Sequence, residues 1–313
     1  MKTLIFGAGP LGSLYTYLLH KAGNDVTLLA RGEHCEFLKE NGLVLVNEFS
    51  QEKLIEKVSV VNVLGEDDMY DLVIVLMRKN SLRNVFPVLS QKKNIPNFLF
   101  MGNNALGFDE YLDHLPKDKV LFGFPGGGGS RIDHVVHYVD SDKPGGMRFP
   151  IVIGEIDGQS RERTKKIKSM FESSGVPVEI MGDIDGWLKY HVAMINPIAR
   201  ALLKCGDNYK LANDKDTLKT YIRAVKEGGR VLKALGYKKR YPFKYNLFYW
   251  MPEGLLAIAL KKFFSSKFVE IAFMLHLHAA RDEMIELGIE LKSLTKQTSI
   301  PTPNLDELLG YIS

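Results

Sequence analysis

The stretch that decides the fold lies at the start of the chain, where residues 3–12 read Thr-Leu-Ile-Phe-Gly-Ala-Gly-Pro-Leu-Gly. Four residues typical of a buried strand precede a Gly-x-Gly-x-x-Gly pattern. Apolar residues then recur at helical spacing from Leu11 to Ala22, and Val26–Leu29 predicts a second strand. A strand, a glycine-rich loop, a helix and a strand within about thirty residues form one βαβ unit.

Each glycine of the pattern has a physical reason. Gly7 permits a tight turn, Gly9 lets the backbone approach a pyrophosphate, and Gly12 lets the helix pack close to the strand. The helix that begins at Pro10-Leu11 offers backbone N–H groups and the positive end of its dipole to phosphates. With a strand before it and a helix after it, the pattern predicts a dinucleotide site on a Rossmann-type domain.

The residues after the second strand indicate NADP(H) rather than NAD(H). An NAD site usually carries Asp or Glu there, to hold the ribose hydroxyls. This chain has Ala30-Arg31-Gly32 instead, and a guanidinium can bind a 2′-phosphate with several donors. Arg78 follows the apolar run Leu72–Met77 and is a second candidate for phosphate or ribose, with a solvated role equally open.

Strand and helix patterns alternate up to about residue 182. Further strands are expected at 72–77, 98–101, 120–124, 135–139, 150–153 and 177–180, helices at 81–89 and 161–174, and a flexible loop at 125–129. From Asp183 onward almost only helical periodicity remains, with long helices over 184–204, 218–235 and 268–295. We therefore predict an α/β domain with a mainly parallel sheet over residues 1–182, followed by an all-helical domain over 183–313.

Composition narrows the function classes. The chain has 313 residues, 45% hydrophobic and 25% charged, with a net charge of +4 and two cysteines. These values favour an ordinary globular protein of a reducing compartment, without a disulfide framework. The glycine pattern starts too early to leave room for a signal peptide, and no apolar run reaches the ~20 residues of a membrane helix. We expect a cytoplasmic protein that binds neither membrane nor nucleic acid.

Helix 184–204 carries the main catalytic candidate. At 100° per residue, Lys189, Ala193, Asn196 and Arg200 fall on one stripe. A positioned ammonium can protonate the alkoxide that forms when hydride reduces a ketone, so Lys189 is a candidate general acid. Spacing alone leaves the alternative of a surface lysine open. Asn104, shortly after strand 98–101, can orient the nicotinamide ribose or a substrate carbonyl.

Two further groups have weaker signals. Glu283 lies on the third long helix, where a partner of the lysine and a plain surface carboxylate are equally compatible with the spacing. His276 and His278 point to different sides of a helix, and His278 with Asp282 supplies only two ligands on one face. No metal site is therefore predicted.

Several of these motifs together resemble ketopantoate reductases along nearly the whole chain. They are the glycine loop, Arg31, Asn104-x-x-Gly107, Trp187-x-Lys189 with Asn196-Pro197, and Ile300-Pro-Thr-Pro-Asn304. The resemblance implies a Rossmann domain followed by a helical domain, with an active site between them that reduces 2-dehydropantoate with NADPH in pantothenate biosynthesis. It further implies the following roles: general acid for Lys189, active-site glutamate for Glu283, 2′-phosphate binding for Arg31, nicotinamide and substrate contacts for Asn104, and substrate contacts for Asn196 and Asn208.

The chain departs from the family pattern at four positions. Ala193 stands where the family commonly has an asparagine, Ile271 where it has a serine, and Arg78 where it has a lysine. The family's second asparagine after the lysine arrives one residue early, at Asn196. We expect the changes at Ala193 and Ile271 to make the substrate pocket roomier and more apolar, so that ketopantoate is not the best substrate. The alternatives are a related NADP-dependent dehydrogenase of another hydroxy acid or an opine, and a non-catalytic NADP(H) sensor. A homodimer is the expected assembly.

Overall fold

The computed structural model describes residues 1–274, 277 and 280–311. It divides into two compact units. The first consists of Met1–Gly102 and Phe108–Ile184, and the second of Asn103–Gly107 and Asp185–Ser313. The division falls two residues beyond the predicted boundary and assigns the short segment after residue 102 to the second unit.

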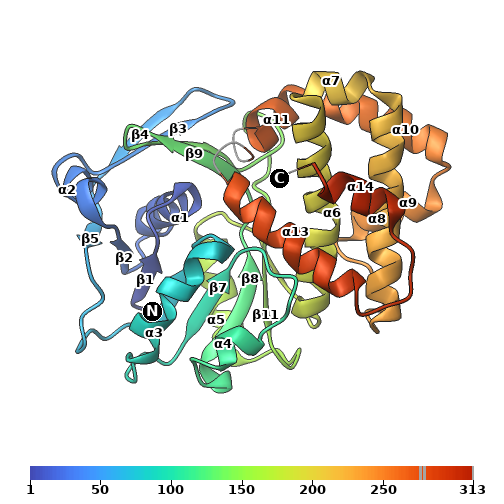
Figure 1. Ribbon diagram of the computed structural model, residues 1–313. Coiled ribbons are helices and arrows are strands. Elements are labelled where there is room, and N and C mark those ends of the chain that lie inside the picture. The colour runs from blue at the N-terminus through green and yellow to red at the C-terminus, as the bar shows by residue number, and fades with distance from the viewer. Residues whose placement is uncertain (275–276, 278–279, 312–313) are drawn as a thin grey trace. The chain divides into compact units, whose positions relative to one another are not determined.

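An eight-stranded sheet forms the core of the first unit (Figure 1). Its strands, in spatial order, are β12 (Val178–Ile180), β11 (Ile151–Glu155), β8 (Val120–Phe124), β7 (Phe98–Met101), β6 (Leu72–Val75), β1 (Thr3–Phe6), β2 (Val26–Leu29) and β5 (Ser59–Val61). All neighbours are parallel except β8 and β11. Every residue of β1, β2, β6 and β7 is buried, as expected for apolar strands covered on both faces. The prediction of a mainly parallel α/β domain is confirmed.

A second, four-stranded sheet was not predicted as a unit. It contains β4 (Lys53–Glu56), β3 (Leu43–Asn47), β10 (Val135–Val139) and β9 (Gly128–Ile132) in that order. Helix α1 (Pro10–Lys21) contacts strands of both sheets (Figure 1). The expected flexible loop at 125–129 is wrong in part, because Gly128 and Gly129 pair with β10. A Cβ at Gly129 would lie 2.2 Å from the His137 carbonyl oxygen, so close strand approach, rather than flexibility, explains this glycine.

The remaining helices of the first unit are short apart from α2 and α5. They are α2 (Gly32–Asn41), η1 (Lys79–Asn84), α3 (Phe86–Ser90), α4 (Asp109–Leu112), η2 (Lys117–Lys119) and α5 (Glu162–Ser173). The predicted helix 81–89 is instead a 3-10 turn followed by a new helix. Pro87 lies in the first turn of α3, where its missing N–H is tolerated, whereas in a continuous helix it would interrupt the hydrogen bonds.

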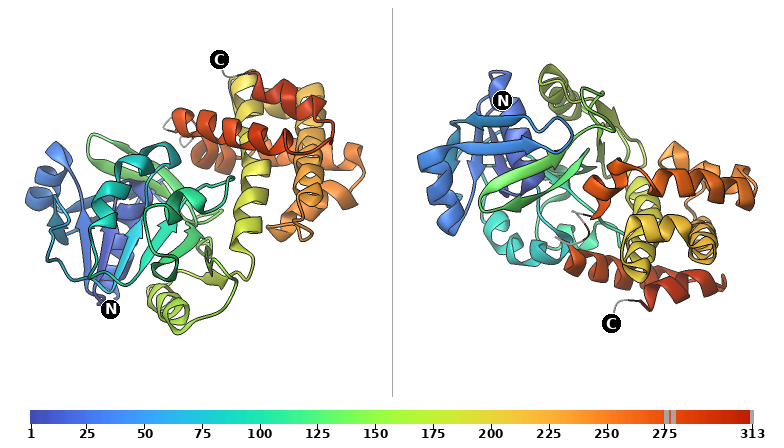
Figure 2. Two further views of the ribbon diagram at one scale, coloured as in Figure 1. Left: turned by 60° about the horizontal axis from the view of Figure 1, so that its bottom comes forward. Right: turned by 90° about the horizontal axis from the view of Figure 1, so that it is seen from above.

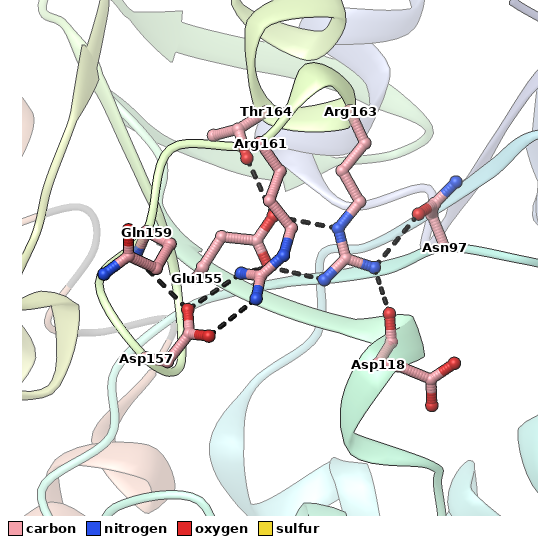
Figure 3. Close-up of polar contacts among 8 residues, drawn as sticks. All are labelled: Asn97, Asp118, Glu155, Asp157, Gln159, Arg161, Arg163 and Thr164. Carbon is pink, nitrogen blue, oxygen red and sulfur yellow. Dashed lines mark hydrogen bonds and ion pairs between the residues drawn. The ribbon is translucent and has the colours of Figure 1, made fainter.

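A buried ion-pair network closes the end of this sheet that lies away from the glycine loop (Figure 3). Glu155, at the end of β11, accepts hydrogen bonds from Arg163 Nε and Thr164 Oγ1 at 2.8 Å, and Arg161 lies 3.3 Å away. Arg163 also reaches Asn97, just before β7, at 3.2 Å. Because β11 is antiparallel to β8, this network lies at the amino ends of the parallel strands, and its role is structural.

The second unit contains only helices among its described residues (Figure 2). They are α6 (Ile184–Cys205), α7 (Asn208–Asn213), α8 (Lys215–Ala234), η3 (Phe243–Asn246), α9 (Leu247–Trp250), α10 (Glu253–Phe264), α11 (Lys267–Val269), η4 (Glu270–Met274), α13 (Arg281–Thr295) and α14 (Pro303–Leu309). This confirms the predicted helical region. Within the described ranges, no helix is long and apolar enough to cross a membrane.

One long helix of the second unit was predicted wrongly. The expected helix 268–295 is interrupted, because η4 is a π-helix and Ala280, at φ −125° and ψ 31°, caps the start of α13 outside helical geometry. Helix α6, by contrast, continues through Pro197 to Cys205.

Candidate active site

Two of the three glycines in the loop are required by the backbone geometry around them. A Cβ at Gly12 would lie 1.9 Å from the Gly7 carbonyl oxygen, and Gly7 itself has φ +123°. Gly9 differs, because its φ of −77° suits any residue and a Cβ there would meet nothing within 4 Å. Close backbone contacts and a positive φ therefore explain Gly7 and Gly12, whereas no contact within the described structure explains Gly9.

The first turn of α1 is compatible with the predicted dinucleotide site. No side chain caps the helix N-terminus, and no acidic residue occupies its first turn. The N–H groups of Leu11 and Gly12 belong to the turn that lacks intrahelical partners, next to Pro10, which has no N–H. An uncapped helix start beside an open glycine is a fitting cradle for the phosphates of a dinucleotide.

Arg31 lies two residues after the end of strand β2, as predicted. It is the N-terminal cap residue of α2, and it is exposed. Its guanidinium lies over the ring of Phe6, 5.6 Å from the ring centroid, and Phe6 immediately precedes Gly7. Stacking on an aromatic face orients the guanidinium without using its hydrogen-bond donors. Arg78 is also exposed and precedes the first turn of η1, after β6.

In the second unit, Lys189 is a buried lysine held by two side chains. It is 4% exposed on α6, and its Nζ forms an ion pair with Asp185 one turn earlier. Tyr237 Oη donates to the other carboxylate oxygen of Asp185 at 2.6 Å, and Lys189 Nζ lies 5.0 Å from the centroid of the Tyr237 ring. The alternative of a solvated surface lysine is inconsistent with this burial.

The segment Asn103–Gly107 packs against the same helix. A Cβ at Gly107 would lie 3.4 Å from Lys189 Nζ, and Gly107 has φ +87°, so glycine is required there. Asn104 Nδ2 donates to the Gly107 carbonyl at 2.6 Å, which closes the turn. Asn104, predicted from its place after β7, thus shapes the turn against which the lysine lies.

The same segment is held by two carboxylates of α13. Glu283, which is 4% exposed, accepts from Asn103 Nδ2 at 3.4 Å. Glu290, which is 3% exposed, accepts from the backbone N–H of Ala105 at 2.9 Å. Glu283 is therefore not a plain surface carboxylate.

The predicted substrate residues have different surroundings. Asn196 is fully buried on α6 and donates from Nδ2 to the Met284 carbonyl at 2.9 Å. Asn208 donates from Nδ2 to the Phe264 carbonyl of α10 at 2.7 Å. Ala193 is fully buried, and a Cβ at Gly228 of α8 would lie 3.2 Å from its methyl carbon. The expectation that Ala193 enlarges a pocket is wrong, because its small side chain serves the close approach of α6 and α8.

Sequence reasoning missed several residues of this group. Asp185 lies four residues before Lys189, a spacing that brings opposite charges together on a helix and was available as a signal. Tyr237, Asn103 and Glu290 had no comparable local signal. Of the histidines considered for a metal, His276 and His278 lie outside the described residues. The described part of the chain holds no group of three or more metal-ligating side chains.

Comparison with known proteins shows which family the first part of the chain is similar to. Residues 3–145 match the family model described as ketopantoate reductase PanE/ApbA. The N-terminal part of the chain is therefore similar to ketopantoate reductases. The resemblance stated from the motifs is thereby confirmed.

Relatives of the chain include proteins with and without a named reaction. The chain is 30% identical over 200 residues to the uncharacterized oxidoreductase YkpB of Bacillus subtilis, a match that spans 61% of this chain and 61% of that protein. It is 28% identical over 247 residues to a 2-dehydropantoate 2-reductase of Pyrococcus horikoshii, covering 76% of this chain and 75% of the relative.

Solved structures extend the likeness in fold to the helical part. The 2-dehydropantoate 2-reductase of Methylococcus capsulatus superposes with a TM-score of 0.75 at 15% identity, over 99% of this chain and 95% of that one. D-mandelate dehydrogenase, in a ternary structure with NADH and anilino(oxo)acetate, superposes with a TM-score of 0.77 at 18% identity, over 99% and 96% of the two chains. At these identities the likeness shows the fold alone.

Proposed function

We propose that this protein is an NADPH-dependent reductase of a 2-oxo acid, with Lys189 as the proton donor. The observation that carries the proposal is the arrangement of a buried lysine, held by Asp185 and Tyr237, against the turn Asn104–Gly107. The match to the family model and the relatives named 2-dehydropantoate 2-reductase support a nicotinamide-dependent oxidoreductase. The buried lysine speaks against the NADP(H) sensor, which needs no proton donor.

The cofactor part of the proposal depends on the first unit. The glycine loop and the start of α1 would hold the pyrophosphate, and Arg31 would bind the 2′-phosphate through the donors that stacking on Phe6 leaves exposed. Arg78 offers a second cation at the end of β6 for phosphate or ribose. Bound NADPH would supply the hydride.

The proton would come from the second unit. As the keto carbon gains the hydride, its oxygen develops negative charge, and the Lys189 ammonium would stabilise that charge and then transfer one proton to it. Asp185 would orient the ammonium before the transfer, and Tyr237 would hold Asp185. Asn104, Asn196 and Glu283 would position the substrate, with Glu283 accepting from a substrate hydroxyl. Asn208 is the weakest of the proposed contacts, since its amide is already bound to Phe264.

A steady-state assay tests this function. NADPH oxidation by the purified protein is measured with a panel of 2-oxo acids that includes ketopantoate, and the same panel is measured with NADH. We expect turnover of at least one 2-oxo acid, with preference for NADPH. Absence of turnover across the panel, with the protein folded and cofactor bound, would reject the enzymatic proposal and favour the sensor.

The second candidate is a related dehydrogenase with another substrate. The departure from the family pattern at Ile271, where the family has a serine, favours this candidate. The same assay distinguishes the two, because a related dehydrogenase would reduce another oxo acid more efficiently than ketopantoate.

A further inference from the structure

Arg200, on α6, is a buried arginine without a carboxylate partner among the described residues. It is 3% exposed, and its Nη2 donates to the Met284 carbonyl at 3.3 Å. Nε and Nη1 have no hydrogen-bond partner. Burial and the nearby charge of Arg281 lower the pKa of Arg200 to about 10, so that the side chain is still a cation at neutral pH.

Helix α13 makes room for this cation. A Cβ at Gly288 would lie 2.5 Å from Arg200 Nη2 and 3.4 Å from Asn196 Oδ1. A glycine inside a helix makes the helix less stable than an alanine would. The space that the Arg200 guanidinium needs explains why Gly288 is nevertheless present. Asn196 donates to the same Met284 carbonyl as Arg200, and its Oδ1 is buried and unpaired.

Two other buried charges, those of Glu155 and Lys189, are neutralised by ion pairs. Glu155, which is 2% exposed, is surrounded by Arg161 and Arg163 (Figure 3). An uncompensated buried charge is strongly destabilising, because it loses hydration without gaining a counter-charge. Arg200 has unpaired donors and Asn196 has an unpaired acceptor. A ligand that offers an acceptor to Arg200 and a donor to Asn196 would satisfy both.

We infer that Arg200 binds a carboxylate group of the substrate and that Asn196 Oδ1 accepts a hydrogen bond from a hydroxyl or amine of the same molecule. A carboxylate provides the missing counter-charge and accepts from the free guanidinium donors. The inference rests on the proposed function and adds to it which residue recognises the acid. It also predicts that the preferred substrate carries a hydrogen-bond donor near the carboxylate.

The carboxylate concerned is either the one next to the ketone or a second one further away. Arg200 lies eleven positions after Lys189 along α6, a rise of roughly 16 Å. Lys189 pairs with Asp185, one turn before it, and Arg200 shares the Met284 carbonyl with Asn196, also one turn before it. Both side chains therefore extend toward the N-terminal end of α6, as helix geometry favours. This separation favours a carboxylate distant from the ketone, and the kinetic test below distinguishes the two sources.

A binding test does not depend on turnover. The variants Arg200→Met and Arg200→Lys are compared with the wild-type protein and with Arg281→Met, the control for loss of a neighbouring positive charge. The probe is acetate, measured against chloride at equal ionic strength. We expect acetate at about 100 mM to raise the melting temperature of the wild type and of Arg281→Met by a few degrees.

The variants at Arg200 should respond differently. Acetate should leave the melting temperature of Arg200→Met unchanged, and Arg200→Lys should retain part of the shift because it keeps the charge. Without acetate, Arg200→Met should melt no lower than the wild type, since it loses an uncompensated buried charge. No acetate shift in the wild type, or equal shifts in the wild type and Arg200→Met, would overturn the inference.

A kinetic test identifies the carboxylate. The kcat/KM of Arg200→Met is compared with that of the wild type for 2-oxo acids with one and with two carboxylates. We expect a loss of about 100-fold or more, as is usual when one partner of a buried charge pair is removed. A loss on all 2-oxo acids assigns the carboxylate beside the ketone, and a loss confined to diacids assigns the distant one. No loss on any substrate contradicts the inference. If the wild type reduces no 2-oxo acid, the proposed function fails, and the acetate test still decides the role of Arg200.

Discussion

Lys189 and Asp185, one turn apart on α6, form an ion pair in which the lysine is almost fully buried and the carboxylate is partly exposed. Tyr237, beyond the end of α8, donates to the second oxygen of this carboxylate. The carboxylate therefore has one oxygen for the ammonium and one for the phenol, which restricts the lysine to a narrow range of positions. A proton donor that is positioned before the reaction loses less entropy when the substrate binds.

Replacing Lys189 by alanine tests the proton donor. Turnover should fall by ~10²–10⁴-fold, the range for loss of general acid catalysis, while NADPH affinity stays nearly unchanged. Lys204→Ala on the same helix is the control, because Lys204 pairs with Glu307 instead. Steady-state kinetics and cofactor titration measure the two effects. Near-normal turnover of Lys189→Ala would exclude the role.

The positioning role of Asp185 is tested by Asp185→Asn, which keeps the shape and removes the charge. A less well-held ammonium should lower kcat by about 10- to 100-fold, with little change in the KM for NADPH. Tyr237→Phe keeps the ring, removes the hydrogen bond to Asp185 and should give a smaller loss in the same direction. The idea would be abandoned if KM for NADPH rose while kcat held, because that pattern indicates a cofactor-binding role.

Arg31→Ala tests the cofactor preference. Loss of a charged hydrogen bond to the 2′-phosphate should weaken NADPH binding by ~1.5–3 kcal/mol and change NADH binding little. Fluorescence titration with both cofactors measures this difference. Lys39→Ala, an exposed lysine of α2, controls for general loss of positive charge. Equal losses for the two cofactors would contradict a 2′-phosphate contact.

The pH dependence of stability should report on His34. This side chain is 7% exposed, its Nε2 has no hydrogen-bond partner, and its Nδ1 lies 3.1 Å from His134 Nδ1. Burial, with the charges of Arg131 and His134, lowers the pKa of His34 to about 4. Between about pH 6.5 and 4 the unfolded state then binds the proton and the folded state does not, so the free energy of unfolding falls as pH falls.

The loss from this histidine should reach up to about 2 kcal/mol after allowance for partial solvent screening. Urea unfolding at pH 7 and at pH 4.5 measures it in the wild type and in His34→Phe, which cannot titrate. The decrease between the two pH values should be smaller in the variant. An identical decrease in both proteins would show that other groups cause the acid sensitivity.

The Glu155 network offers a stability prediction in the first unit. Arg163→Met leaves the buried carboxylate without its two hydrogen bonds from that guanidinium and should lower the free energy of unfolding by about 3 kcal/mol. Arg161, whose side chain is 43% exposed, is the control, and Arg161→Met should cost less than about 1 kcal/mol. Chemical denaturation measures both values, and similar losses would refute the distinction between buried and exposed pairs.

Features that depend on neighbouring residues could be predicted from the sequence. The strand Thr3–Phe6, the glycine turn and helix α1 follow from local spacing, and Arg31 follows from its position after the second strand. The helical second unit followed from periodicity alone. Lys189 could be placed on a helix, and its ion pair with Asp185 was within reach of the four-residue spacing.

Tertiary structure decided which distant groups meet. Glu283 and Asn103 are 180 residues apart in the chain, and no local pattern indicates that their side chains hydrogen-bond. The sequence places Ala193 on the same helical stripe as Lys189, but it does not indicate that Gly228 of α8 packs against Ala193. Nε and Nη1 of Arg200 are buried without a partner because of how α6 and α13 pack, which no local pattern indicates. Periodicity assigns a residue to a helix and a face, but pairing and burial depend on how the helices pack, which residues far apart in the chain determine together.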